Sequence, residues 1–462
     1  MPWSAIGAYA AMLAAAAAIL LLVVRVGATL SAPPPAPPQV VTGVDTGPTS
    51  NILFHVVLAL AAVILIGRAL GLLLAHFRQP PVIGEVLAGI MLGPSLLGRI
   101  APDLAAFVLP AAIVPALTLI AQVGVVLYMF LVGLELNLDR VGSRAHTNVA
   151  ISHASIVAPF VLGSSLALYL YPRFSTSDVP FISFALFSGV AMSITAFPVL
   201  ARILADRGMT RSELGVIALT CAAVDDVTAW CLLACVVAVA EASAGSAVMV
   251  VALTFVFVVL MLVVVKPVAR RLVGASEDRL RWPAILVTLA GVYTSAFLTE
   301  QIGVHAIFGA FLFGAIVPHD SRLARTLTDN LTGPVTVSLL PAFFAFAGMR
   351  TRIDLVSGVS AWLVCGLIII VATAGKFGGT FVAARLTGID ARQAAGLGIL
   401  MNTRGLMELI VLNIGLDLGV LTPELFTMMV LMALATTMAT SPLVDAVVRE
   451  RSVRATIPDA RS

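Results

Sequence analysis

Apolar stretches long enough to cross a lipid bilayer follow one another through almost the whole chain. A membrane-spanning helix needs about 20 mostly apolar residues, and inside lipid the backbone must be satisfied within helices or closed barrels. Only 11% of the 462 residues are charged, whereas about 25% are charged in a typical soluble domain. We therefore predict an all-α membrane protein. Its thirteen expected transmembrane helices are residues 53–75, 81–98, 114–137, 148–171, 178–205, 212–240, 246–268, 282–300, 303–318, 333–349, 359–384, 392–416 and 424–446.

The two ends of the chain differ from this series. Residues 1–25 form a further apolar segment without a basic start, which we interpret as either a cleaved signal peptide or a retained anchor helix. Residues 26–51 are a linker too rich in proline to fold. Residues 447–462 are a short basic tail, so we expect no cytosolic regulatory domain after the membrane domain at 52–446.

Arginine and lysine are distributed unevenly between the predicted loops. The loops after odd-numbered helices are rich in both, whereas those after even-numbered helices hold only Arg99, Arg173, Arg350 and Arg352. Basic residues gather on the cytoplasmic side of a membrane protein. We therefore expect a multi-pass protein of the plasma membrane with its C-terminus in the cytoplasm and residues 26–51 outside.

This orientation predicts an internal symmetry. The first six helices begin outside and the last six begin inside, so two six-helix halves joined by the seventh helix would be inverted repeats. Transporters of this kind bind substrate near the middle of the membrane, at discontinuous helices in equivalent places of both halves. We expect such breaks in 178–205 and 392–416, the alternative being a proline kink and a tilted amphipathic helix. The polar and helix-weakening residues there are Ser193, Thr195, Pro198, Asn402, Thr403, Arg404, Gly405 and Glu408.

Two adjacent aspartates lie inside an apolar stretch, in the segment CAAVDDVTAW at residues 221–230. In lipid each carboxylate costs roughly 2.5–3.5 kcal/mol on an insertion scale, so Asp225 and Asp226 are expected to have a function. Desolvation penalises the bare charge, and either a proton or a small cation relieves the penalty. Competition for one carboxylate is therefore enough to couple two opposite fluxes.

Six further motifs follow one another between residues 52 and 446. They are RQPPVIGEVLAGIMLGPSLLG, FLVGLELNLD, SITAFPVLARILADRG, GVHAIFGAFLFGAIVP, LPAFFAFAGMRT and LMNTRGLMELIVLNIG. Together with the paired aspartates they resemble the monovalent cation:proton antiporter family that includes the bacterial Kef systems and the plant CHX exchangers. The resemblance implies exchange of Na⁺ or K⁺ for protons by alternating access. It also implies a moving core bundle at about 148–240 and 359–446, and a panel at about 53–137 and 282–349 that forms a homodimer.

The resemblance also implies roles for single residues. Asp226 would bind the transported Na⁺ or K⁺ and the proton, with Thr195 and the opened backbone of its helix offering further oxygens. Relatives carry Asn or Gln at the position of Asp225, while electrogenic members carry Asp, so we expect electrogenic exchange. The second carboxylate needs a cation, either Lys376, which is one of two lysines, or Arg404. A purely structural ion pair is the alternative for both, and Glu408, Ser193 and Asn402 are accessory candidates.

Other polar residues carry weaker signals. We expect structural roles for Glu85 and Glu135, and for Glu300 and His305 we favour structure over a pH sensor. The four cysteines lack metal-ligand spacing and are expected to pack as small apolar residues.

The sequence lacks the motifs that are typical of several other functional classes. Without a phosphate-binding loop, a catalytic triad or a zinc motif, we expect no enzyme and no cofactor, and neither nucleotide nor nucleic acid as partner. A ligand-gated K⁺ efflux channel remains an alternative, although a selectivity filter of the TVGYG type is missing. A sodium-coupled organic-anion symporter is another, and it would need a roomier polar cavity but no paired aspartates.

Overall fold

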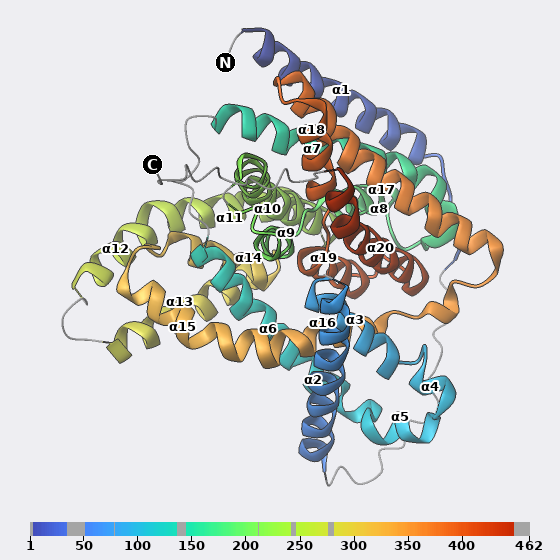
Figure 1. Cartoon of the computed structure of the whole chain (residues 1–462), viewed down its shortest axis with the longest axis vertical. Coiled ribbons are helices and arrows are strands. Elements are labelled where there is room, and N and C mark those ends of the chain that lie inside the picture. The colour runs from blue at the N-terminus through green and yellow to red at the C-terminus, as the bar shows by residue number, and fades with distance from the viewer. Residues whose placement is uncertain are drawn as a thin grey trace, which may run out of the picture.

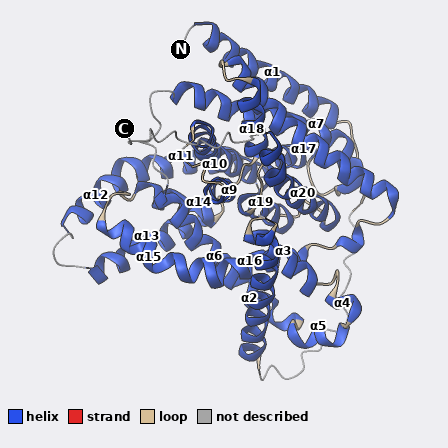
Figure 2. Ribbon diagram, in the orientation of Figure 1, coloured by secondary structure: helices blue, strands red, loops and turns tan. Residues whose placement is uncertain are grey.

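The computed structural model describes residues 3–34, 51–77, 79–135, 145–210, 212–241, 246–275 and 281–447. Every regular element in these segments is a helix (Figure 2). The α-helices are α1 Trp3–Gly27, α2 Ile52–His76, α3 Pro81–Leu92, α4 Leu97–Ile100, α5 Pro102–Val108, α6 Val114–Glu135, α7 Ala145–Phe174, α8 Phe181–Ser193, α9 Phe197–Asp206, α10 Glu213–Glu241, α11 Ser246–Leu260, α12 Lys266–Ala275, α13 Arg281–Ile302, α14 Ala306–Ile316, α15 Arg322–Pro334, α16 Leu340–Arg350, α17 Gly358–Leu386, α18 Ala391–Met401, α19 Leu406–Asp417 and α20 Pro423–Val447. Short 3₁₀ turns occur at Ala111–Ile113 and Ile353–Leu355, and π turns at Met261–Val265 and Val335–Leu339.

Within the described segments, 11 helical stretches are long and apolar enough to cross a membrane. One of them is the N-terminal stretch Tyr9–Gly27, and each of the others overlaps a stretch predicted from the sequence. The three remaining predicted stretches are helical but shorter. Residues 303–318 contain the 11-residue α14, and residues 178–205 and 392–416 each contain two short helices. The all-helical membrane class is thus confirmed for the described part of the chain.

One helix lies where the sequence predicts a loop. α15 occupies most of the stretch between the ninth and tenth predicted helices and continues through the π turn Val335–Leu339 into α16. Ser321 caps its start, because its hydroxyl accepts a hydrogen bond from the Ala324 N–H at 3.0 Å. The residues of α15 resemble a linker in the sequence because this helix is amphipathic and buries only Ala324 and Leu327.

The helices form two groups that pack mainly within themselves (Figure 1). We call α7–α10 together with α17–α20 the crossing group, and α2, α3, α6 and α13–α16 the flanking group. In the crossing group α7 packs on α8, α10 and α17, while α20 packs on α17, α18 and α19. In the flanking group α14 packs on α6 and α13, and α16 packs on α3 and α6. The contacts between the two groups include that of α16 with α19.

α1 lies along the crossing group, against α7 and α8 (Figure 1). The hydroxyl of Tyr9 is 2.9 Å from Nδ1 of His153 on α7. Val23 is buried, and beyond the helix the carbonyl of Pro33 accepts a hydrogen bond from the Ser177 N–H at 2.9 Å. These contacts attach the N-terminal segment to the crossing group.

The two helices expected to be discontinuous are both interrupted. The first break covers residues 194–196, between α8 and α9, and the second covers residues 402–405, between α18 and α19. The backbone N–H of Ala196 donates to the carbonyl of Thr403 at 2.9 Å, so the two breaks cross each other. Gly405 has φ 158° and ψ −124°, a conformation that side-chain-bearing residues rarely adopt. Helix ends leave backbone groups unpaired, which is costly in lipid, and the crossing segments supply partners for each other.

Candidate ion-binding site

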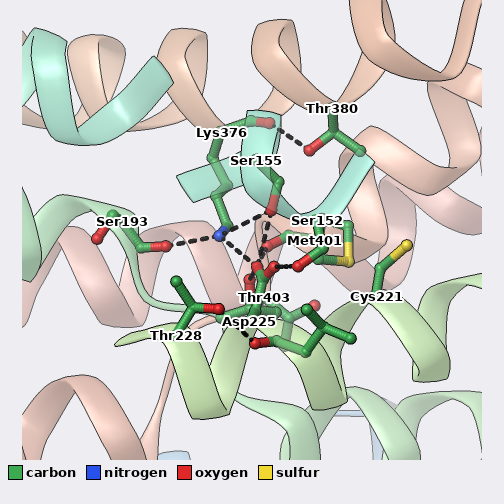
Figure 3. A network of polar contacts seen from close by, with 12 residues as sticks. Ser152, Ser155, Ser193, Cys221, Asp225, Thr228, Lys376, Thr380, Met401 and Thr403 are labelled. Carbon is green, nitrogen blue, oxygen red and sulfur yellow. Dashed lines mark hydrogen bonds and ion pairs between the residues drawn. The ribbon is translucent and has the colours of Figure 1, made fainter. Parts of the chain in front are cut away.

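Asp225, near the middle of α10, is fully buried, and its carboxylate is surrounded by hydrogen-bond donors (Figure 3). Oδ1 accepts the hydroxyl of Ser152 at 2.5 Å. Oδ2 accepts the hydroxyls of Ser155 at 2.8 Å and of Thr195 at 2.9 Å. Ser152 and Ser155 are three residues apart on α7 and therefore share a face of that helix, while Thr195 comes from the first break. Three hydroxyls thus hold this carboxylate in place.

Lys376 on α17 provides the counter-charge. Its Nζ is 2.9 Å from Oδ2 of Asp225, and both side chains are fully buried. It also donates to the carbonyl of Ser193 at 2.6 Å and to the hydroxyl of Ser155 at 3.4 Å (Figure 3). Ser193 is the last residue of α8, where the helix dipole is negative and favours a cation. Lys376 and Arg404 were the two candidate counter-charges for Asp225, and in the structure Lys376 forms the ion pair.

Arg404, in the second break, lies at the same end of α8. Its guanidinium donates to the carbonyls of Ala191 at 3.1 Å and Met192 at 2.6 Å. Its Nη1 is also 3.3 Å from Oε2 of Glu408, one turn further along in α19, and both side chains are fully buried. Arg404 therefore caps the C-terminal end of α8 and pairs with Glu408, not with Asp225.

Asp226 lies in a different environment from its neighbour. Only 3% of the residue is exposed, and no ion pair involves it among the described residues. The backbone N–H of Phe197, at the start of α9, hydrogen bonds to its carboxylate. Its Oδ1 has no hydrogen-bond partner within the described part of the chain. A buried carboxylate without a counter-charge has to be neutralised by a proton or a cation, and Oδ1 is free to bind either one.

Thr195, in the first break, contacts the neighbour of Asp226. Its hydroxyl lies within hydrogen-bonding distance of Oδ2 of Asp225 at 2.9 Å and of the carbonyl of Met401 at 3.1 Å, and its role as an oxygen ligand of an ion at Asp226 stays a prediction. A charged carboxylate is a stronger acceptor than a neutral group, which explains why the Asp225–Lys376 pair attracts this hydroxyl. Thr195 therefore joins the first break to the end of α18 and to α10.

Two of the accessory candidates, Ser193 and Asn402, also lie at the breaks. The hydroxyl of Ser193 donates to the carbonyl of Val190 within its own helix at 2.9 Å, so only its backbone carbonyl contacts Lys376. The side-chain amide nitrogen of Asn402 is 3.5 Å from the hydroxyl of Thr373. Its Oδ1 is buried and has no partner among the residues that the structure describes.

Ser152 and Ser155 are site residues that the sequence did not reveal. Hydroxyls inside membrane helices commonly bond to the carbonyl one turn earlier in their own helix, so a serine alone carries little signal. The signal available in ISHASIV is the three-residue spacing, which puts both hydroxyls on one face. Such a pair indicates a polar acceptor on the helix packed against that face.

The weaker candidates lie away from the aspartates. Oε2 of Glu300 accepts the N–H of Ala306 at 2.8 Å, and His305 caps the start of α14, so both residues shape a turn. Glu85 is half-buried on α3, and the side chain of Glu135 lies outside the described part. Across the described segments, no group of three or more His, Cys, Asp or Glu residues could hold a metal ion.

Known proteins resemble this chain over most of its length. The family model described as the transmembrane sodium/hydrogen exchanger matches residues 59–448. The Na⁺/H⁺ antiporter NhaS4 of Synechocystis sp. is 44% identical over 401 residues, which cover 86% of this chain and 97% of that protein. The cation/H⁺ antiporter 20 of Arabidopsis thaliana is 41% identical, covering 84% of this chain and 48% of that protein. The K⁺/H⁺ antiporter 1 of Saccharomyces cerevisiae is 31% identical, covering 87% and 47%. The chain thus spans about half the length of these plant and yeast relatives.

A solved structure shares the fold. The sodium proton antiporter MjNhaP1 from Methanocaldococcus jannaschii superposes with a TM-score of 0.61 at 14% sequence identity, covering 86% of this chain and 97% of that one. At this identity the likeness concerns the fold alone. The match to the family model, over residues 59–448, includes both breaks and both aspartates of the crossing group. The chain therefore belongs to the sodium/hydrogen exchanger family.

Proposed function

We propose that this chain is a secondary transporter that exchanges a monovalent cation, Na⁺ or K⁺, for protons, and that Asp226 binds the two in turn. The contrast between the adjacent carboxylates carries this proposal. Both oxygens of Asp225 are hydrogen bonded and the group is paired with Lys376, whereas Asp226 is buried with Oδ1 free. The relatives, which include proteins named as Na⁺/H⁺ and K⁺/H⁺ antiporters, agree with this chemistry.

Competition at Asp226 couples the two fluxes. A bare carboxylate at this depth would be an uncompensated charge away from water, which is strongly unfavourable. A proton on the carboxylate removes the charge, and a bound cation balances it, but the two do not occupy the same oxygen together. The cation therefore binds after the proton leaves, and a proton returns only after the cation leaves. This exclusion is sufficient for antiport.

The other charged residues hold the geometry of the breaks. The Asp225–Lys376 pair fixes α10 and α17 at the end of α8, and Arg404 with Glu408 fixes the start of α19 at the same place. We assign to Thr195 the role of orienting Asp225. Asn402 is a candidate for a further neutral ligand because its buried Oδ1 has no partner in the described residues.

Movement of the crossing group against the flanking group would give the site access to each side in turn. We propose that the crossing group is the core bundle expected at 148–240 and 359–446, because it holds both breaks and both aspartates. The flanking group would form the homodimer, and the two halves of the chain would be inverted repeats. We place the protein in the plasma membrane with a cytoplasmic C-terminus, and we favour retention of α1 as an anchor because it packs on α7 and α8.

We infer that the exchange is electrogenic, because Lys376 supplies a second group that can lose a proton. A cation at Asp226 adds positive charge beside the buried Asp225–Lys376 pair, and lysine, unlike arginine, can release its proton when buried. Two protons would then leave for each cation that enters. Each net charge moved is worth about 2.3 kcal/mol per 100 mV, so the membrane potential would drive the exchange.

Proton movement in proteoliposomes tests the proposal. A pH-sensitive dye inside the vesicles should respond to added NaCl or KCl with wild-type protein, and Asp226→Asn should abolish the response while the protein still folds and inserts. Asp103→Asn, the same change at an exposed carboxylate on α5, should behave as wild type. Near-normal exchange by well-expressed Asp226→Asn protein would end the proposal. Cation flux without proton movement would favour a channel, and dependence on an organic anion would favour a symporter.

A further inference from the structure

We propose that Trp230 positions a water molecule that stays bound to the transported cation at Asp226, an inference that rests on the function proposed above. Trp230 follows Asp226 by four residues on α10, so the two side chains occupy successive turns of one face. Long side chains on a helix lean back over the preceding turn. This direction would bring the indole ring of Trp230 toward the turn that carries Asp226.

The two side chains present complementary buried atoms that lack partners. Trp230 is 4% exposed, and its Nε1–H has no hydrogen-bond partner among the described residues. The same holds for Oδ1 of Asp226. Buried donors and acceptors in folded proteins are nearly always paired, often through an ordered water. An unpaired donor and an unpaired acceptor one turn apart on the same face indicate a bound species that satisfies both.

The ring of Trp230 is held in place from the flanking group. It stacks on Phe311 of α14, with ring centroids 6.3 Å apart and an interplanar angle of 29°. Offset stacking of two aromatic rings favours a fixed orientation. In this conformation the orientation of the indole thus depends on a contact between the two helix groups as well as on α10.

The chemistry of the indole determines what can lie next to it. An indole N–H is a donor only, so its positive hydrogen repels a bare cation and requires an acceptor. Water meets this requirement, because one lone pair of its oxygen can accept the N–H while the other coordinates Na⁺ or K⁺. With no cation bound, the same water can donate to Oδ1 of Asp226. The occupant that fits both states is a partly hydrated monovalent cation.

Exchange by Trp230→Phe protein in proteoliposomes tests this role, because the substitution keeps an aromatic ring at this position and removes the N–H donor together with one of the two fused rings. We expect the half-saturating concentration of Na⁺ or K⁺ to rise about five- to tenfold, as for the loss of one hydrogen bond, while the maximal rate changes less than about twofold. Trp282→Phe is the matched control, since Trp282 is exposed on α13, and it should change neither quantity.

Tryptophan fluorescence gives a second measurement that does not depend on transport. The chain has four tryptophans, and replacing Trp3, Trp282 and Trp362 by Phe leaves Trp230 as the only indole. Its emission should shift when Na⁺ or K⁺ is added, and the shift should disappear with Asp226→Asn. An unchanged half-saturating concentration in the Trp230→Phe protein would overturn the role of Trp230. The same holds if the emission of Trp230 does not shift when the cation is added. Loss of exchange in Asp226→Asn alongside either result would leave the proposed function standing, whereas full exchange by Asp226→Asn would remove both.

Discussion

Replacing Lys376 by Met would leave the carboxylate of Asp225 buried without its counter-charge. Both side chains are fully buried and 2.9 Å apart, so solvent does not screen the pair. Removing one partner of such a pair typically destabilises a protein by about 3–5 kcal/mol. The carbonyl of Ser193 would also lose its 2.6 Å hydrogen bond from Nζ. We therefore expect the free energy of unfolding to fall by about 3–5 kcal/mol.

A double substitution separates the pair from the loss of packing. Asp225→Asn in the Lys376→Met background removes the uncompensated charge and keeps the shape of the side chain. The double variant should be more stable than Lys376→Met alone by at least about 2 kcal/mol. Unfolding curves in detergent, recorded for the wild type, both single variants and the double variant, give the coupling energy. Lys266→Met, at the start of α12 and half-buried, is the control for the loss of a lysine.

A small coupling energy would refute this reasoning. If the two substitutions were additive within about 0.5 kcal/mol, Asp225 and Lys376 would not depend on each other in the folded protein. Equal stability of the Lys376→Met and Lys266→Met proteins would contradict it in the same way.

Two further predictions concern the contacts on the side where α13 ends and α14 begins. Asp417→Asn removes the 2.6 Å ion pair with Arg350 that joins α19 to α16. Because the side chains of Asp417 and Arg350 are 52% and 24% exposed, we expect the free energy of unfolding to change by about 0–1 kcal/mol. The initial exchange rate should change less than about fivefold. Burial lowers the pKa of His305, an effect that Glu300 and Asp417 partly oppose. The unfolded chain therefore binds more protons as the pH falls through about 6.5 and below. The melting temperature should drop on acidification, and it should drop less in His305→Gln; an identical pH profile for both proteins would contradict this.

The sequence predicts both interrupted helices of the crossing group because polar residues lie at their breaks. Polar residues in mid-span, such as Thr195 and Asn402, are unfavourable in an ordinary membrane helix, so they indicate both breaks. α15 escapes prediction because it is amphipathic and buries only Ala324 and Leu327, so its sequence resembles a polar loop. The 11-residue α14 is short for a span, and its start lies at the turn formed by Glu300 and His305.

The candidate site is predictable only as a set of residues, and its pairings depend on the fold. Asp225, Lys376 and Arg404 lie on α10, on α17 and in the second break, and no spacing in the sequence says which of the two cations comes within hydrogen-bonding distance of Asp225. The geometry of the α8 end decides it, because its last carbonyl orients Lys376 while the two preceding carbonyls bind Arg404. The same holds for Trp230, whose missing partner becomes visible only when its surroundings are known.

The most direct test of Asp226 as the shared binding group is to count the protons released when a cation binds. Purified protein in a weakly buffered solution would be titrated with NaCl or KCl while the pH and the bound cation are measured together. We expect at least one proton to be released for each cation bound, and we expect Asp226→Asn to show neither binding nor release. Cation binding without proton release in the wild type, or unchanged release in Asp226→Asn, would contradict the assignment of Asp226.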